Sequence, residues 1–89
     1  MISNSFQMNC SEGFHLRPSQ VLVEALANFQ CEISLKKSTG EEANAKSILG
    51  LMSLGIETGE TVEVETDGSD EKEAMEAVEK LFKNNFYES

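Results

Sequence analysis

The chain has 89 residues, of which 39% are hydrophobic and 26% charged, a composition typical of one globular domain, here spanning residues 1–89, with a modest core. Seven lysine and arginine residues against 16 aspartates and glutamates give a net charge of −9, which disfavours binding to nucleic acid or to an anionic membrane. No apolar run approaches the roughly 20 residues that cross a bilayer, and the N-terminus lacks the features of a signal peptide, so we expect a cytoplasmic protein without membrane insertion.

The first predicted element is a strand over residues 2–8, where apolar and polar side chains alternate imperfectly. A loop follows up to Gly13, and the chain's only histidine, arginine and proline then fall within four positions, as His15, Arg17 and Pro18. A glycine followed shortly by a proline is typical of a turn that opens a helix, so we expect Pro18 at or near the first helical position and His15 just outside the helix. The unpaired N–H groups and the dipole of a helix start favour an anion at this place.

The apolar residues from Pro18 to about Phe29 lie on one helical stripe, which predicts a helix packed on a core. The stripe consists of Val21, Leu22, Ala25, Leu26 and Phe29. Residues 31–36 then alternate between apolar and polar side chains and predict a second strand. Because Gly40 lies in the turn that follows, we expect a hairpin with a short third strand over residues 41–43.

A short apolar segment, residues 45–55, predicts a helix of about two turns, with Ser47 as its N-cap and Gly55 at its end. Apolar side chains cover most of its circumference, so a helix of this length buries all of them only if the core surrounds it. Some of Ile48, Leu49 and Met52 are then exposed as a docking site, or else the helix is wedged entirely into the core. The periodicity of the segment leaves both interpretations open.

Residues 61–66 alternate strictly and predict a fourth strand whose glutamates face water. A last helix follows, with Ser69 or Asp70 as its N-cap and Glu73 completing a capping box. Its predicted inner stripe is Ala74, Met75, Val78, Leu81 and Phe82. We expect residues 84–89 to be a flexible tail, with the alternative that Phe86 and Tyr87 fold back onto the body. This order of elements favours an α+β fold, an antiparallel sheet with helices on one face.

The chemistry that the sequence offers passes through His15. Imidazole can be unprotonated near neutral pH and forms a labile bond to phosphorus, while Arg17 and the helix start provide donors for phosphate oxygens. The chain lacks a histidine pair for a metal, a Ser–His–Asp set and a glycine-rich nucleotide loop. Cys10 and Cys31 lack metal-ligand spacing, and we expect both to be reduced rather than joined in a disulfide.

Residues 13–19, Gly-Phe-His-Leu-Arg-Pro-Ser, resemble the Gly-x-His-Ala-Arg-Pro-Ala active-site motif of the HPr family. Members of this family are the histidine-containing phosphocarriers of the phosphoenolpyruvate-dependent sugar phosphotransferase system (PTS). Residues 45–55 are similar to the family's second motif, and residues 68–71 resemble its entry to the last helix. The resemblance implies an open-faced β-sandwich, with a four-stranded antiparallel sheet and three helices packed on one face.

The resemblance also implies a function. His15 is expected to accept a phosphoryl group on Nδ1 from phosphorylated Enzyme I and to pass it to a sugar-specific Enzyme IIA, with Arg17 steadying the phosphate. The protein is then a monomeric relay carrier rather than a stand-alone enzyme, and it needs no cofactor and no metal. Ser47 matches the serine that an HPr kinase/phosphorylase modifies in some bacteria. The expected apolar docking patch consists of Phe14, Leu16, Ile48, Leu49 and Met52.

An alternative is an HPr-like regulatory module, of the nitrogen-branch or catabolite-repression type, which binds an enzyme or a catabolite-control transcription factor without relaying phosphate. Regulators of that kind lose the histidine, whereas this chain keeps His15. The chain departs from the family at Leu16 and Ser19, which both replace the usual alanine. Leucine adds bulk beside the reactive ring, so Leu16 is expected either to narrow the choice of partner or to mark a specialised paralogue, such as a nitrogen-branch version.

Overall fold

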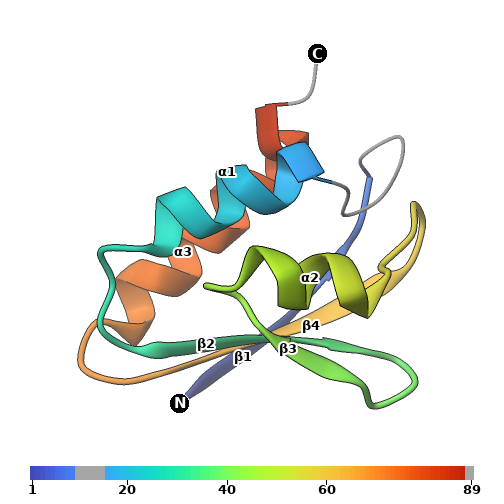
Figure 1. Cartoon of the computed structure of the whole chain (residues 1–89). Coiled ribbons are helices and arrows are strands. Elements are labelled where there is room, and N and C mark those ends of the chain that lie inside the picture. The colour runs from blue at the N-terminus through green and yellow to red at the C-terminus, as the bar shows by residue number, and fades with distance from the viewer. Residues whose placement is uncertain (10–15, 88–89) are drawn as a thin grey trace.

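The structure, a computed structural model, describes residues 1–9 and 16–87, and at Tyr87 only the backbone. Four antiparallel strands form one sheet in the order β1-β4-β2-β3. The strands are β1 (Ile2–Gln7), β2 (Glu32–Lys37), β3 (Glu42–Asn44) and β4 (Thr61–Asp67). Three helices, α1 (Leu16–Leu26), α2 (Ile48–Leu54) and α3 (Glu71–Lys83), all lie on one face of this sheet (Figure 1). This arrangement confirms the predicted α+β fold class.

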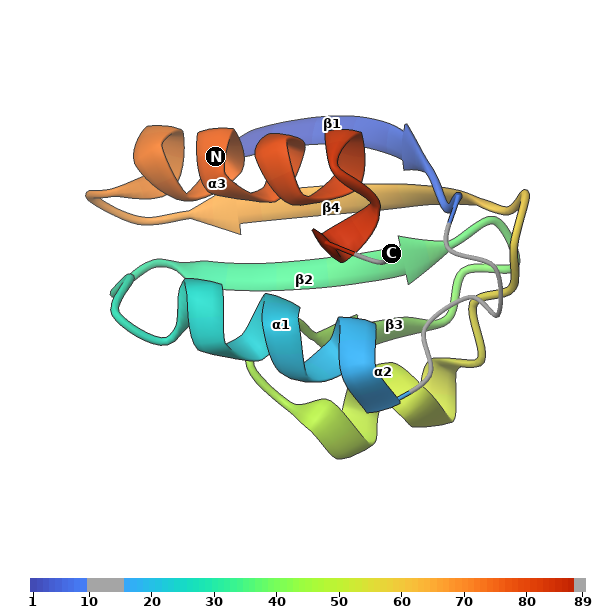
Figure 2. The same ribbon diagram turned by 90° about the horizontal axis from the view of Figure 1, so that it is seen from above.

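The helices lie side by side, with α1 between α2 and α3 (Figure 2). Helix α3 covers β1 and β4, and α2 lies beside β3. The core fills the space between the sheet and the helices, and the opposite face of the sheet is left open. No helix in the described part of the chain is both long and apolar enough to cross a membrane.

Strict alternation in β2 and β4 directs one set of side chains into the core and the other set to the open face. Val62, Val64 and Thr66 of β4 are buried, whereas Glu63 is exposed. Cys31 precedes β2 and is also buried, with a free thiol. Burial and a hydrogen bond to Asp70 raise the pKa of this thiol to about 11, so it stays protonated at neutral pH.

Helix α1 differs from the prediction at both ends. It begins at Leu16, two residues before Pro18, and it ends at Leu26 rather than near Phe29. Proline is compatible with this start because the N–H groups of the first helical turn have no partner within the helix. Ala25, which was predicted to face the core, is exposed. The buried residues of the helix are Pro18, Ser19, Leu22 and Leu26.

The predicted capping box at the start of α3 is wrong. Asp70 stands at the N-cap position, but its side chain makes no capping hydrogen bond. Its carboxylate instead accepts from the backbone N–H groups of Gln30, at 2.8 Å, and Cys31, at 2.9 Å. Asp70 therefore fixes the connection between α1 and β2, a contact between segments about 40 residues apart that local spacing cannot predict.

We expect Asp70→Asn to lower the midpoint of thermal unfolding at pH 7 by several degrees, because a neutral amide is a weaker acceptor for two N–H groups. The hydrogen bond from Gln30 is the main cause that holds the pKa of Asp70 below its usual value. A lowered folded-state pKa stabilises the fold at high pH, and this stability is lost as the pH falls below about 4. The difference between parent and variant, followed by circular dichroism against pH, should therefore shrink in acid. Glu24→Gln, which removes an exposed carboxylate from α1, is the matched control, and an equal loss in both variants contradicts the assignment.

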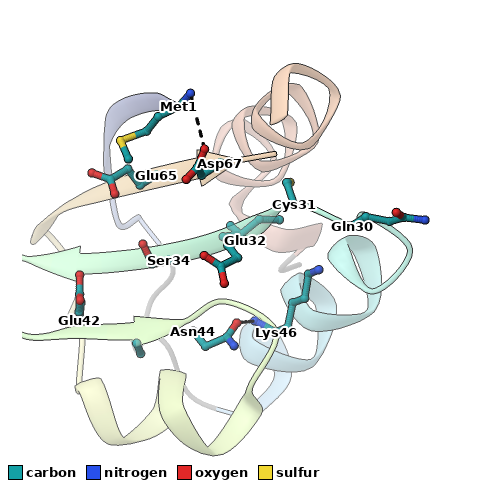
Figure 3. Close-up of a pocket in the computed structure, with 12 residues that line it drawn as sticks. Met1, Gln30, Cys31, Glu32, Ser34, Glu42, Asn44, Lys46, Glu65 and Asp67 are labelled. Atoms are coloured by element: carbon teal, nitrogen blue, oxygen red, sulfur yellow. Dashed lines mark hydrogen bonds and ion pairs between the residues drawn. The ribbon is translucent and has the colours of Figure 1, made fainter. Parts of the chain in front are cut away.

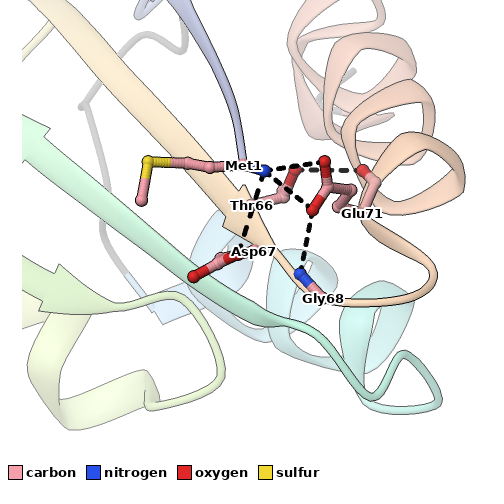
Figure 4. A network of polar contacts seen from close by, with 5 residues as sticks. All are labelled: Met1, Thr66, Asp67, Gly68 and Glu71. Carbon is pink, nitrogen blue, oxygen red and sulfur yellow. Dashed lines mark hydrogen bonds and ion pairs between the residues drawn. The ribbon is translucent and has the colours of Figure 1, made fainter.

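A second polar network joins the N-terminus to the start of α3 (Figure 4). The Met1 ammonium donates to both carboxylate oxygens of Glu71, at 3.0 and 2.9 Å, and this carboxylate also accepts from the Gly68 N–H at 3.0 Å. The Gly68 hydrogen bond and then the ammonium lower the pKa of Glu71. Thr66 adds a hydrogen bond from its hydroxyl to the Glu71 carbonyl at 3.0 Å. The network fixes one end of β1 and β4 to α3.

The segment after α3 folds back onto the body. Residues Asn85–Tyr87 form a 3-10 turn, η1, in which Asn85 and Phe86 have positive φ angles of 51° and 55°. Phe86 is 2% exposed and packs edge-to-face on Phe82, with ring centroids 4.8 Å apart. Of the two alternatives for this segment, the structure shows the one in which Phe86 folds back.

Candidate functional site

The start of α1 is the first part of the candidate site. Leu16 is the first helical residue, and His15 precedes it in the chain; His15 and Phe14 lie outside the described residues. Arg17 is exposed, and no described residue pairs with its guanidinium. Pro18 and Ser19, one turn into the helix, are buried and anchor it on the core. The guanidinium of Arg17 therefore faces solvent two residues after His15. It lies at the start of a helix, where the helix dipole favours a bound anion.

Helix α2 forms the second part of the site, and both predicted ends are confirmed. Ser47 is the N-cap, and its Oγ accepts from the Gly50 N–H at 3.0 Å. Gly55 ends the helix in the left-handed conformation, with φ at 68°. A methyl group on Gly50 would lie 3.2 Å from the Ser47 hydroxyl oxygen, closer than ordinary contact, so glycine here protects the cap. The hydroxyl of Ser47 is thereby held at the start of α2.

Exposed apolar side chains gather on α1 and α2, which lie side by side. Four large hydrophobic residues are exposed among those the structure describes, and three belong to these helices: Leu49 at 78%, Leu16 at 51% and Met52 at 43%. We call these three residues the α1–α2 patch. Ile48 is only half-buried, while Leu51 and Leu54 hold the inner side of α2 in the core. The structure therefore places four of the five predicted docking residues at the surface or partly exposed, and Phe14 lies outside the described residues.

Lys46, which the sequence did not single out, helps to place α2. Its Nζ donates to the backbone carbonyl of Phe29, just beyond the end of α1. Its backbone N–H donates to the Asn44 Oδ1 at 2.9 Å. These two contacts fix the turn before Ser47 against the end of α1. Local sequence patterns could not predict the contact between Lys46 and Phe29, because the two residues are 17 positions apart.

The buried hydroxyl of Ser19 is a second feature that the sequence pattern could not predict. Its side chain is fully buried, and its hydroxyl oxygen has no hydrogen-bond partner in the part of the chain that the structure describes. A buried hydroxyl without a partner costs about 1–3 kcal/mol. The family alanine at this position avoids that cost.

We expect Ser19→Ala to raise the free energy of unfolding by about 1 kcal/mol, which is about 4–8 °C in the melting midpoint of a domain this small. Ser53→Ala, at an exposed helical serine, is the matched control for the change in helix propensity alone. Thermal unfolding followed by calorimetry measures both variants. A Ser19→Ala midpoint at or below that of the parent contradicts the assignment.

Comparison with known proteins finds one matching family model and similar proteins that align over most of the chain. The family model described as PTS HPr component phosphorylation site matches residues 2–84. The phosphocarrier protein HPr of Xylella fastidiosa (strain Temecula1) is 38% identical over 88 residues, covering 99% of this chain and 98% of that protein. The HPr-like protein Crh of Halalkalibacterium halodurans is 41% identical over 78 residues, covering 88% and 92%.

A solved structure extends the match to the whole fold. HPr-C-His from Thermoanaerobacter tengcongensis has a TM-score of 0.93 to this chain at 34% identity, covering 100% of this chain and 99% of that one. The family match spans all four strands and all three helices. The chain therefore belongs to the HPr family of PTS phosphocarrier proteins.

Proposed function

We propose that this protein accepts a phosphoryl group on His15 from phosphorylated Enzyme I and passes it to a sugar-specific Enzyme IIA during sugar uptake. The observation that carries the proposal is the family match over residues 2–84, within which residues 13–19 keep the histidine, the arginine and the proline of the active-site motif. The exposure of Arg17 at the start of α1 supports it, because both partners must reach the same place.

In this proposal the imidazole Nδ1 of His15 attacks the phosphorus of phosphorylated Enzyme I. A nitrogen–phosphorus bond forms, the bond from phosphorus to the Enzyme I donor atom breaks, and its electron pair returns to that donor. The second transfer repeats these steps with Enzyme IIA as the acceptor and frees the imidazole. Arg17 and the N–H groups at the start of α1 neutralise the phosphate while it resides on the ring.

The α1–α2 patch provides the contact surface for both partners in turn. Leu16, Leu49 and Met52 expose apolar area. In this proposal the area lies beside the phosphorylation site, and its burial when a partner docks makes the binding free energy more favourable. Because both partners use one surface, the carrier releases Enzyme I before it meets Enzyme IIA. We place this exchange in the cytoplasm, where both partners are available.

The test mixes the protein with Enzyme I and phosphoenolpyruvate labelled in its phosphate. We expect a stoichiometric label that is lost in acid and stable in alkali, as a phosphohistidine is, and that His15→Ala abolishes. The variant must keep the circular dichroism spectrum of the parent. Absence of label on the parent, or label that survives His15→Ala, excludes the proposed carrier.

The second candidate is a regulatory module that binds an enzyme or a catabolite-control transcription factor. The similarity to the HPr-like protein Crh favours it, and it uses the same α1–α2 patch. Ser47 is the proposed regulatory site, modified by an HPr kinase/phosphorylase with ATP. Phosphate there would add negative charge beside the patch and hinder docking of Enzyme I. ATP-dependent label that Ser47→Ala removes, with no label from phosphoenolpyruvate, identifies the regulator rather than the carrier.

A further inference from the structure

The four methionines of the chain differ in how far solvent reaches them. Met8 is fully buried and Met75 is 5% exposed, whereas Met1 and Met52 are 72% and 43% exposed. A thioether is oxidised when the oxidant reaches its sulfur, so a buried methionine reacts only after the fold has opened locally. Met1 and Met52 are therefore the two methionines that a small oxidant in solution reaches in the folded protein.

The two exposed methionines lie on different faces of the molecule. Met1 lines a hollow beside Glu65 and Asp67 of β4, on the face of the sheet that the helices leave open (Figure 3). Met52 belongs to α2, on the helix side of the sheet, and it is part of the α1–α2 patch. Oxidation of Met52 therefore changes the patch, and oxidation of Met1 leaves the patch as it is.

The sulfur of Met52 is the atom of the patch that an oxidant attacks. Leu16 and Leu49, the other two members, have hydrocarbon side chains. Conversion of the thioether to a sulfoxide makes an apolar side chain polar. A sulfoxide buried against an apolar partner surface loses its hydrogen bonds to water and gains little from burial. Oxidation at this one position therefore lowers the affinity of the patch for a partner.

The position of Met52 allows this change without loss of the fold. Leu51 and Leu54 hold the inner side of α2 in the core, whereas Met52 lies on its outer side. The two ends of the helix are fixed by Ser47 and Gly55, whose contacts do not involve Met52. An oxygen added to Met52 thus alters the surface and places no polar group in the core.

The thiol in the described part of the chain does not compete for the oxidant. Cys31 is 2% exposed, so its sulfur is shielded from solvent. Its raised pKa, about 11, keeps it as a thiol at neutral pH, whereas the thiolate is the form that oxidants attack. Cys10 lies outside the described residues, and the experiment below follows it separately.

We propose that Met52 is a site of reversible oxidation by peroxides, and that the sulfoxide weakens docking of Enzyme I on the α1–α2 patch. The Met52 sulfur donates an electron pair to one oxygen of hydrogen peroxide, so a sulfur–oxygen bond forms and the oxygen–oxygen bond breaks. The second oxygen leaves as hydroxide, which takes the proton of the transferred hydroxyl group and becomes water. In the reverse step, two thiols of a reductase give up two electrons to form a disulfide, and the sulfoxide oxygen leaves as water. The effect on docking rests on the proposed function, whereas the site of oxidation does not.

The first test treats the full chain with hydrogen peroxide and follows each methionine by peptide mass mapping. We expect Met52 to be oxidised at least about tenfold faster than Met8 and Met75, because the core must open before those two sulfurs react. The same map reports Cys10 and Cys31, and the variant Cys10→Ser repeats the measurement without the first thiol. Oxidation of Met52 only at the rate of the buried methionines overturns the proposal.

The second test measures steady-state phosphate transfer from Enzyme I to the oxidised protein. We expect the KM to rise about fivefold to tenfold with little change in the turnover number, and methionine sulfoxide reductases with a dithiol to restore the original KM. Met52→Leu keeps the apolar area without the sulfur. After the same treatment, which still oxidises Met1, the KM of this variant should stay at its untreated value. An equal rise in the treated parent and the treated variant, or no rise in the parent, overturns the proposal.

A variant that needs no oxidant completes the test. Met52→Gln places a polar side chain of similar length in the patch and should also raise the KM, while the melting midpoint stays near that of the parent. The map of oxidised methionines uses no Enzyme I, and phosphate label on the untreated protein tests the carrier by itself, so the two proposals fail separately. A protein that is labelled normally, but whose KM is the same before and after oxidation of Met52, overturns this inference and leaves the carrier in place.

Discussion

Replacing Arg17 with glutamine should slow phosphoryl transfer from Enzyme I about tenfold to a hundredfold. A hydrogen bond to a charged group contributes about 1.5–3 kcal/mol, and this exposed guanidinium is the cation that follows His15 in the chain. Arg17→Lys keeps the charge but loses the planar pair of donors, so we expect an intermediate rate. Rapid-quench measurement of the labelled protein gives the rate constants.

The structure provides a matched control for this loss. Lys72→Gln removes one exposed cation from α3 and should leave the transfer rate unchanged. Arg17 has no described partner, so Arg17→Gln should also keep the melting midpoint of the parent. A variant that transfers as fast as the parent, with the same fold, shows that another group neutralises the phosphate and removes Arg17 from the site.

The features that the sequence predicted correctly are those set by local chemistry. The ends of α2 followed from Ser47 and Gly55, because a cap and a left-handed stop each act within one helical turn. The buried face of α3 and the alternation of β4 followed from periodicity alone. Resemblance to the HPr family then indicated the sheet with three helices on one face, which no single periodicity specifies.

The features that the sequence missed depend on contacts between distant segments. Asp70 has the local sequence pattern of a helix cap. Its carboxylate nevertheless accepts hydrogen bonds from the N–H groups of Gln30 and Cys31 instead of from the start of α3. The strand order β1-β4-β2-β3 and the edge position of β1 likewise arise only when strands about 60 residues apart pair. At the candidate site, the exposure of Leu49 and Met52 was open on periodicity and is decided by how α2 packs beside α1.

A charge placed in the α1–α2 patch should weaken the docking of Enzyme I and leave the rate of phosphoryl transfer in the docked complex nearly unchanged. Leu49 is 78% exposed, so Leu49→Glu should leave the melting midpoint unchanged. It should raise the KM of Enzyme I for this protein about tenfold to a hundredfold, because a leucine buried on docking contributes about 1.5–3 kcal/mol and a glutamate there must be desolvated. The turnover number should change little, since Leu49 is not part of the proposed phosphate site.

Two further variants show whether the effect belongs to the patch. Met52→Ala removes apolar area without adding charge and should raise the KM by a smaller factor. Ala25→Glu adds the same charge at an exposed position of α1 outside the patch and should leave the KM near that of the parent. Steady-state kinetics with Enzyme I at several concentrations of each variant measures both parameters. An Ala25→Glu effect as large as that of Leu49→Glu would mean that overall charge, rather than the apolar surface of α1 and α2, governs the encounter.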